Sequence, residues 1–169
     1  EKKRYFSNGT QILRIDNEDI IQDWKPKSLA KLKMESYDVV ILSDYKKGVI
    51  YNEFHSKLIK KKCITFVDPK NKPQFYKNAF LVKPNMEKFE EWVGKFSKKK
   101  AFDLLKLMGW SWLVISHNKH GVYVFNKFGE HNFYKVKIVK NANVVGAGDI
   151  FFSGILYNYL NKKDIFSSV

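Results

Sequence analysis

A run of small residues leads into an acid near the end of the chain, in the segment 143–149, which reads Asn-Val-Val-Gly-Ala-Gly-Asp. Small residues at 146–148 allow a tight turn in which successive backbone N–H groups point into one concavity. A helix is expected to start there, and its dipole favours an anion. Asp149, in the first turn, could accept a proton from an attacking hydroxyl. The segment suits phosphoryl transfer, although a first-turn acid and a small-residue turn can also serve packing alone.

The elements that must position this segment alternate between strands and helices. Apolar runs of strand length, most of them closed by polar residues, occupy 37–42, 63–67, 79–82 and 112–116. Helical spacing or helix-start signals occur at 26–34, 51–62, 86–93, 97–108 and 150–160. Ser97 is expected to cap its helix and Gly109 to end it. The apolar run 150–160 predicts a buried helix.

Two further pairs of extended segments complete the pattern. Residues 2–15 predict a hairpin around Asn8-Gly9, and 122–125 with 132–138 alternate like antiparallel strands. Alternating strands and helices imply a mostly parallel sheet, whose ligands lie beyond the carboxyl ends of the strands. The polar residues at those ends are Ser43-Asp44, Asp68-Pro69-Lys70, Pro84-Asn85 and Ser116-His117.

Composition limits the broad class of the protein. The 169 residues, 44% hydrophobic, suit one globular domain, and no apolar run is long enough to span a bilayer. The chain opens on charged residues rather than a signal-peptide pattern, and Cys63 is its single cysteine, so we expect a reducing, cytoplasmic setting. The net charge of +14 fits an anionic partner, or a surface that is solvated by scattered lysines. Because the first methionine is Met34, we expect a partial domain.

The segment 143–156 resembles, over its whole length, the second signature of the ribokinase-like (PfkB) carbohydrate kinases. The resemblance implies an α/β three-layer sandwich with a mostly parallel sheet and part of a small β lid. It also implies roles at the turn. Asp149 would be the catalytic base, and the amides of Gly146, Ala147 and Gly148 would form the anion hole.

The rest of the chain is similar to one branch of that family, the heptose 7-phosphate kinase domain of bifunctional heptose kinase/adenylyltransferases. The matching motifs, in order, are Arg4, 11–16, 42–48, 67–70, 75–79 and 83–90. Residues 1–16 would then be a lid-type hairpin, and 37–169 the nucleotide and catalytic region. The branch transfers the γ-phosphate of ATP to the anomeric hydroxyl of heptose 7-phosphate, with Mg²⁺ bridging phosphates, on the route to ADP-heptose for the lipopolysaccharide core.

The same resemblance assigns binding residues. Residues expected near the sugar or its phosphate are Arg4, Arg14, Asp44, Lys46 and Lys70. Residues expected near the nucleotide are Asn85, Ser116, Asn118, Gly121 and Gly148. Plainer roles remain open, because Asp44 and Asp68 could cap turns, and Arg14 could pair with Asp16 or Glu18.

Three positions depart from the family pattern. Lys88 stands where the family carries the Glu of Asn-x-x-Glu, which helps to order Mg²⁺, so no metal ligand is assigned. Asn118 replaces a frequent Gly, a mild change because Asn tolerates left-handed backbone. Asn143 replaces an Asp near the loop and the monovalent-cation region of many relatives. Lys88 is the serious departure, since an ammonium group binds phosphate but repels a metal.

Two functions of different class follow. The first is an active kinase for heptose 7-phosphate or for another sugar. The second is a ribokinase-fold protein that has lost turnover and binds a nucleotide or a sugar phosphate. We expect small-molecule partners, no membrane or nucleic-acid partner, and pairing of two copies through the lid strands.

Overall fold

The computed structural model describes residues 2–7, 10–17, 36–48, 50, 63–137 and 146–169. Its strands are β1 (Lys2–Ser7), β2 (Thr10–Asp16), β3 (Val40–Ser43), β4 (Thr65–Asp68), β5 (Leu81–Val82), β6 (Trp112–His117), β7 (Gly121–Asn126) and β8 (His131–Tyr134). Its helices are α2 (Met86–Val93), α3 (Lys98–Met108) and α4 (Ala147–Leu160), with short 3-10 turns η3 (Pro73–Tyr76), η4 (Asn118–His120) and η5 (Phe166–Ser168). The helices expected at 26–34 and 51–62 lie outside the described residues.

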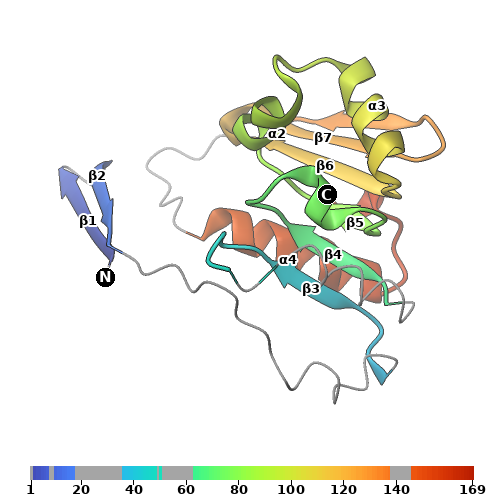
Figure 1. Cartoon of the computed structure of the whole chain (residues 1–169), viewed down its shortest axis with the longest axis horizontal. Coiled ribbons are helices and arrows are strands. Elements are labelled where there is room, and N and C mark those ends of the chain that lie inside the picture. The colour runs from blue at the N-terminus through green and yellow to red at the C-terminus, as the bar shows by residue number, and fades with distance from the viewer. Residues whose placement is uncertain (1, 8–9, 18–35, 49, 51–62, 138–145) are drawn as a thin grey trace.

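One mixed sheet organises the chain (Figure 1). Its six strands run in the order β3-β4-β5-β6-β7-β8. The first four are parallel to their neighbours, and β6, β7 and β8 pair antiparallel. The predicted α/β sandwich with a mostly parallel sheet and an antiparallel pair is confirmed.

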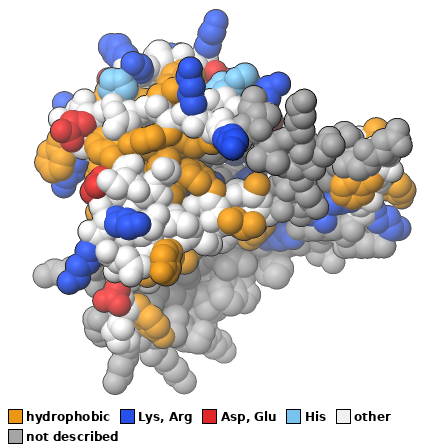
Figure 2. Space-filling view, turned by 180° about the vertical axis from the view of Figure 1, so that it is seen from behind, with side chains coloured by type: hydrophobic (Ala, Val, Ile, Leu, Met, Phe, Trp, Pro, Cys, Tyr) orange, Lys and Arg blue, Asp and Glu red, His pale blue; other side chains and the backbone are white. Residues whose placement is uncertain are grey.

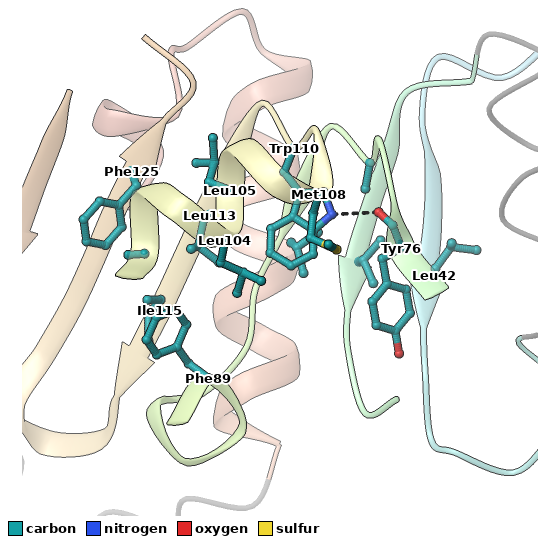
Figure 3. Close-up of a cluster of buried hydrophobic side chains, with 14 of the residues drawn as sticks. Leu42, Tyr76, Phe89, Leu104, Leu105, Met108, Trp110, Leu113, Ile115 and Phe125 are labelled. Atoms are coloured by element: carbon teal, nitrogen blue, oxygen red, sulfur yellow. Dashed lines mark hydrogen bonds between the residues drawn. The ribbon is translucent and has the colours of Figure 1, made fainter. Parts of the chain in front are cut away.

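Helices cover both faces of this sheet, because neighbouring residues of a buried strand point to opposite sides. Val67, Val82 and Leu113 pack with α2 and α3, whereas Phe66, Leu81 and Val114 pack with α4 and η5. On the first face the indole nitrogen of Trp110 donates to the carbonyl of Tyr76 at 2.7 Å (Figure 3). Its polar atom is therefore satisfied within the core.

Helix α3 begins and ends where its sequence predicts. The Ser97 side chain accepts from the backbone N–H of Lys100 at 3.3 Å. Gly109 closes the helix at φ 68°, and a Cβ built there would lie 2.3 Å from Asn78 Oδ1. Both the left-handed backbone and the close approach require glycine.

Several strands differ in extent from the expectation, and those expected at 63–67 and 79–82 begin two residues later, at Thr65 and Leu81. The strand expected at 37–42 begins only at Val40, because its one neighbour β4 begins opposite it at Thr65. The strand expected at 132–138 ends at Tyr134, which pairs with Val122 of β7. Because β7 begins at Gly121, it offers almost no partner to the residues after Tyr134. Pairing partners, rather than local composition, set both ends.

A further correction concerns α4, which is not a fully buried helix. Phe152 and Ile155 are buried against the sheet, but Ile150, Tyr157 and Leu160 are 72%, 69% and 50% exposed. One stripe of a helix faces the sheet, so an apolar run of this length need not be buried all round. No helix among the described residues is long and apolar enough to cross a membrane.

The predicted hairpin forms a separate two-stranded sheet beside the main one (Figure 1). Arg4 lies opposite Arg14 and Tyr5 opposite Leu13, with an irregularity after Tyr5.

Lys and Arg side chains are spread over the face seen in Figure 2, with hydrophobic side chains between them. This scatter matches the lysine-solvated surface that the composition allowed.

Candidate active site and its basic pocket

The turn at Gly146 opens α4 in the way that the sequence predicts. Gly146 is the N-cap at φ 76° and ψ 0°, a left-handed conformation, and it has no side chain to cap the helix. The first intrahelical bond joins the Ile150 N–H to the Gly146 carbonyl at 2.9 Å. The N–H groups of Ala147, Gly148 and Asp149 precede that bond, so the helix itself offers them no acceptor.

These first-turn residues are open to a ligand. Ala147, Gly148 and Asp149 are exposed, and a Cβ built on Gly146 or Gly148 would meet nothing within 4 Å. The turn therefore presents backbone donors and a carboxylate on one accessible helix end. Asn143, which precedes it in sequence, lies outside the described residues.

A buried ion pair links this helix to the ends of the parallel strands. Asp68 ends β4, and Lys83 follows β5 directly. The Lys83 ammonium lies 3.4 Å from the Asp68 carboxylate with only 4% of its side chain exposed, and 5.7 Å from the ring centroid of Phe152. Phe152 is one helical turn beyond Asp149, so the start of α4 lies near the carboxyl ends of the strands.

The residues expected near a nucleotide lie around β5, β6 and the loop after β6. Asn85 and Ser116 form a parallel bridge, and the Asn85 side chain caps α2 by accepting from the Lys88 N–H at 2.8 Å. Asn118 adopts φ 45°, the left-handed backbone that the sequence allowed. Gly121 is at φ 136°, and a Cβ there would lie 2.2 Å from the Tyr134 carbonyl, so glycine is required.

Asp44 is a buried carboxylate that accepts hydrogen bonds from three other residues, and we call this group the Asp44 hub. Its Oδ1 accepts from the Lys46 N–H at 2.7 Å, and its Oδ2 accepts from the Asn71 backbone and side chain at 3.2 and 2.9 Å. The Tyr76 hydroxyl also donates to Oδ2 in a short hydrogen bond. Burial and the adjacent Asp44 carboxylate raise the pKa of Tyr76 well above its usual range. The turn-capping role left open for Asp44 is present, and its contact with a substrate stays a prediction.

A pocket of about 490 Å³ collects several of the predicted substrate residues. It is lined by Arg14, Asp16, Tyr45, Lys46, Lys47, Lys70 and Lys88. Arg14 also pairs with Asp16 at 2.7 Å, which was the plainer alternative for it. Arg4 lies opposite Arg14 in the hairpin and is not among the lining residues that the structure describes. Asp149 is likewise not among the described residues that line the pocket.

Sequence reasoning missed three contributors. Tyr76 and Asn71 hold Asp44 from 32 and 27 residues away, and no local pattern signals this. Lys88 was identified as a departure but not as a pocket residue. The signal that could have found it is its place three residues after Asn85, at the start of a helix that follows a strand.

The pocket does not fit Mg²⁺. That ion prefers carboxylates, waters and substrate phosphates, whereas Lys and Arg supply most of this lining. The described residues also hold no group of three or more His, Cys, Asp or Glu side chains suited to a metal. The Asp149 carboxylate at the start of α4 is one oxygen ligand, which is not a metal site by itself.

Known proteins resemble this chain in sequence and in fold. A bifunctional protein HldE from Hydrogenovibrio crunogenus is 32% identical over 161 residues, covering 88% of this chain and 33% of that protein. The HldE protein of a Marinomonas species is 32% identical over 183 residues, covering 99% and 38%. The chain therefore spans little more than a third of the length of these curated relatives.

Solved structures share the fold at low identity. Phosphofructokinase-2 from Escherichia coli, in complex with substrates and products, matches 95% of this chain and 57% of its own with a TM-score of 0.72 and 17% identity. Ribokinase from Thermotoga maritima matches 81% and 49% with a TM-score of 0.65 and 17% identity. A family model described as pfkB family carbohydrate kinase matches residues 8–169, and the chain therefore belongs to the pfkB family of carbohydrate kinases.

Proposed function

We propose that this chain is part of an ATP-dependent kinase that phosphorylates the anomeric hydroxyl of heptose 7-phosphate, on the route to ADP-heptose and the lipopolysaccharide core. The family supports phosphoryl transfer to a sugar, and the two HldE relatives support the heptose branch. The observation that carries the chemistry is the start of α4, where a left-handed Gly146 exposes first-turn amides beside the Asp149 carboxylate.

The proposed step uses these groups in a defined way. The anomeric oxygen of the sugar attacks the γ-phosphorus of ATP, and Asp149 takes the proton of that hydroxyl. The bond between the γ-phosphorus and its bridging oxygen breaks, and ADP leaves. The N–H groups of Gly146, Ala147 and Gly148 donate to the phosphoryl oxygens as charge spreads over them. Asn85, Ser116 and Asn118, near one edge of β6, are proposed to contact the nucleotide.

The basic pocket is proposed to hold the phosphate that the sugar already carries. Arg14, Lys46 and Lys70 supply cations there, and guanidinium binds phosphate in a bidentate manner. Mg²⁺ would supply charge neutralisation for the nucleotide phosphates when it is bound. We assign no residue of this chain as a ligand of Mg²⁺.

We also propose a cytoplasmic setting, and pairing of two copies of the protein through β1 and β2. The exposed Tyr5 and Leu13 of those strands support the pairing.

The test is product identification with the complete gene product. Incubation with ATP and heptose 7-phosphate should give ADP and a new anomeric phosphate signal in ³¹P NMR. Fructose 6-phosphate, ribose and a nucleoside should give much slower turnover. Faster turnover of one of those sugars would replace the heptose assignment, and absence of turnover with every sugar would contradict the kinase proposal.

Lys88 favours a second candidate, a binding protein without turnover. An ammonium group in the pocket repels a catalytic metal nearby. A Lys88→Glu variant that gains turnover over an inactive parent would support this reading. Loss of turnover in that variant, from an active parent, would exclude it.

A further inference from the structure

The pocket is built from four separate parts of the chain. Arg14 and Asp16 come from β2, Tyr45 to Lys47 from the loop after β3, Lys70 from the loop after β4, and Lys88 from α2. Five of the seven lining side chains are cationic and one is anionic. Because like charges in a shared hollow raise the local potential, this pocket attracts anions and disfavours a divalent cation.

The Lys88 side chain is largely buried and forms an ion pair with Glu91. Its side chain is 16% exposed and pairs with Glu91, whose side chain is 61% exposed. The pKa of Glu91 lies below its usual range because of its hydrogen bond to Lys88, and the charges of Lys88 and Lys46 contribute as well. Lys88 lines the pocket and already pairs with an anionic partner that is itself largely exposed, so an incoming anion could take the place of that carboxylate.

Hydrogen bonds within the chain hold the loops that carry Lys46 and Lys70. Asp44 accepts from the Lys46 N–H at 2.7 Å and from the Asn71 N–H at 3.2 Å, and Asn71 directly follows Lys70. The Tyr76 hydroxyl accepts from the Lys70 N–H at 3.2 Å and donates to Asp44. One buried hub thus fixes the backbone at both lysines, which lowers the entropic cost of binding.

We propose that this pocket binds a phosphate group directly through Lys88, Lys46 and Lys70, without a divalent cation, and that the phosphate displaces Glu91 from Lys88. The ligand class is a phosphate monoester or an inorganic phosphate. The identification of that ester as a sugar phosphate rests on the proposed function. Direct binding of phosphate by the lysines does not rest on the proposed function, because it depends only on the residues of the pocket.

The experiment is calorimetric titration of the complete gene product with inorganic phosphate, in EDTA and again in magnesium chloride. Saturable binding of equal affinity in both buffers is the expected result. Binding that requires magnesium would overturn the proposal, and so would a lack of saturation in both buffers.

Matched variants assign the binding to these residues. Lys88→Ala should weaken phosphate binding about tenfold or more, because a charge-assisted hydrogen bond is lost. Glu91→Gln should strengthen it several-fold, because the competing carboxylate is gone. Lys99→Ala is the control, since Lys99 is also a helical lysine paired with an acid, Asp103, at 2.7 Å and lies 85% exposed outside the pocket. Equal effects of Lys88→Ala and Lys99→Ala, or weaker binding in Glu91→Gln, would contradict the proposal.

Further arms separate the ligand sources and the two proposals. Glucose 6-phosphate that competes with inorganic phosphate in EDTA supports a sugar-phosphate source, whereas competition by ADP alone would overturn that identification. Asp149→Asn should leave phosphate binding unchanged, because Asp149 does not line the pocket. Lysine-dependent phosphate binding in a protein without sugar turnover would remove the proposed function and keep this inference.

Discussion

The start of α4 and the basic pocket are both suited to phosphate, but they are built from different groups. At Gly146 the donors are backbone amides, fixed by one left-handed residue and aligned with a helix dipole. In the pocket the donors are ammonium and guanidinium groups on long side chains, placed by loops around Asp44. The first design depends on backbone geometry, and the second depends on net charge. Added salt and substitution of charged side chains should therefore weaken phosphate binding in the pocket. Substitution of the glycine that sets the backbone should instead impair the helix start.

Apart from loss of the Asp149 carboxylate itself, the largest effect in this comparison is expected at Gly146. Gly146→Ala should lower kcat roughly 100-fold, because a residue that resists φ 76° moves the amide donors, and a lost oxyanion donor costs about that much. Gly154→Ala is the matched control within α4. A Cβ there meets nothing within 4 Å, so this variant should keep its activity and gain about 0.5–1 kcal/mol of stability. Equal kcat in the two variants would show that the turn is not a donor site. Turnover assays and urea unfolding measure both.

The next effect is expected at the hub beneath the pocket. Tyr76→Phe should lower the free energy of unfolding by about 1–3 kcal/mol, because the Asp44 carboxylate loses a buried donor. The wild-type protein should also lose stability as pH rises past about 10, since Tyr76 stays protonated when folded but ionises when unfolded. The variant should lack that contribution. Urea unfolding at neutral and alkaline pH is the measurement, and equal alkaline slopes would contradict the assignment.

Some of these features could be predicted from the sequence and others could not. The caps of α3 and the turn before α4 depend on residues within a few positions of each other, so Ser97, Gly109 and Gly146 indicated them directly. The ends of β3 and β8 depend on partner strands, and the burial of α4 depends on which stripe meets the sheet. The Asp44 hub joins residues 27 and 32 positions apart, which local patterns do not connect.

A smaller effect is expected at Lys70. Lys70→Ala should raise the KM for a sugar phosphate about tenfold and leave kcat within about twofold, because a charge-assisted contact to the substrate's own phosphate is lost. Lys127→Ala, at an exposed lysine after β7, is the control. Added salt should raise KM in the parent more than in Lys70→Ala. A fall in kcat with KM unchanged would place Lys70 at the reacting phosphate instead.

The smallest effect concerns the pair of Lys88 and Glu91, in which the carboxylate is the exposed partner. The pKa of Glu91 is lowered in the folded state, so its contribution to stability is present at neutral pH and is lost as pH falls through the acid range. Glu91→Gln should remove this small acid-side dependence and leave the neutral-pH midpoint nearly unchanged, because solvent around the exposed Glu91 carboxylate screens the pair. Thermal unfolding at mildly acidic and neutral pH should show it. An unchanged acid-side slope would exclude the pair as its cause.

The most direct test of the account is the single-turnover rate of Asp149→Asn in the complete gene product. We expect the rate of phosphoryl transfer to fall roughly 1,000-fold, with the affinity for the sugar phosphate retained, because the base is lost while the pocket is intact. Asp103→Asn, at an exposed acid on α3 that pairs with Lys99, should keep the parent rate. A transfer rate in Asp149→Asn equal to that of the parent would contradict the assignment of Asp149 as the base.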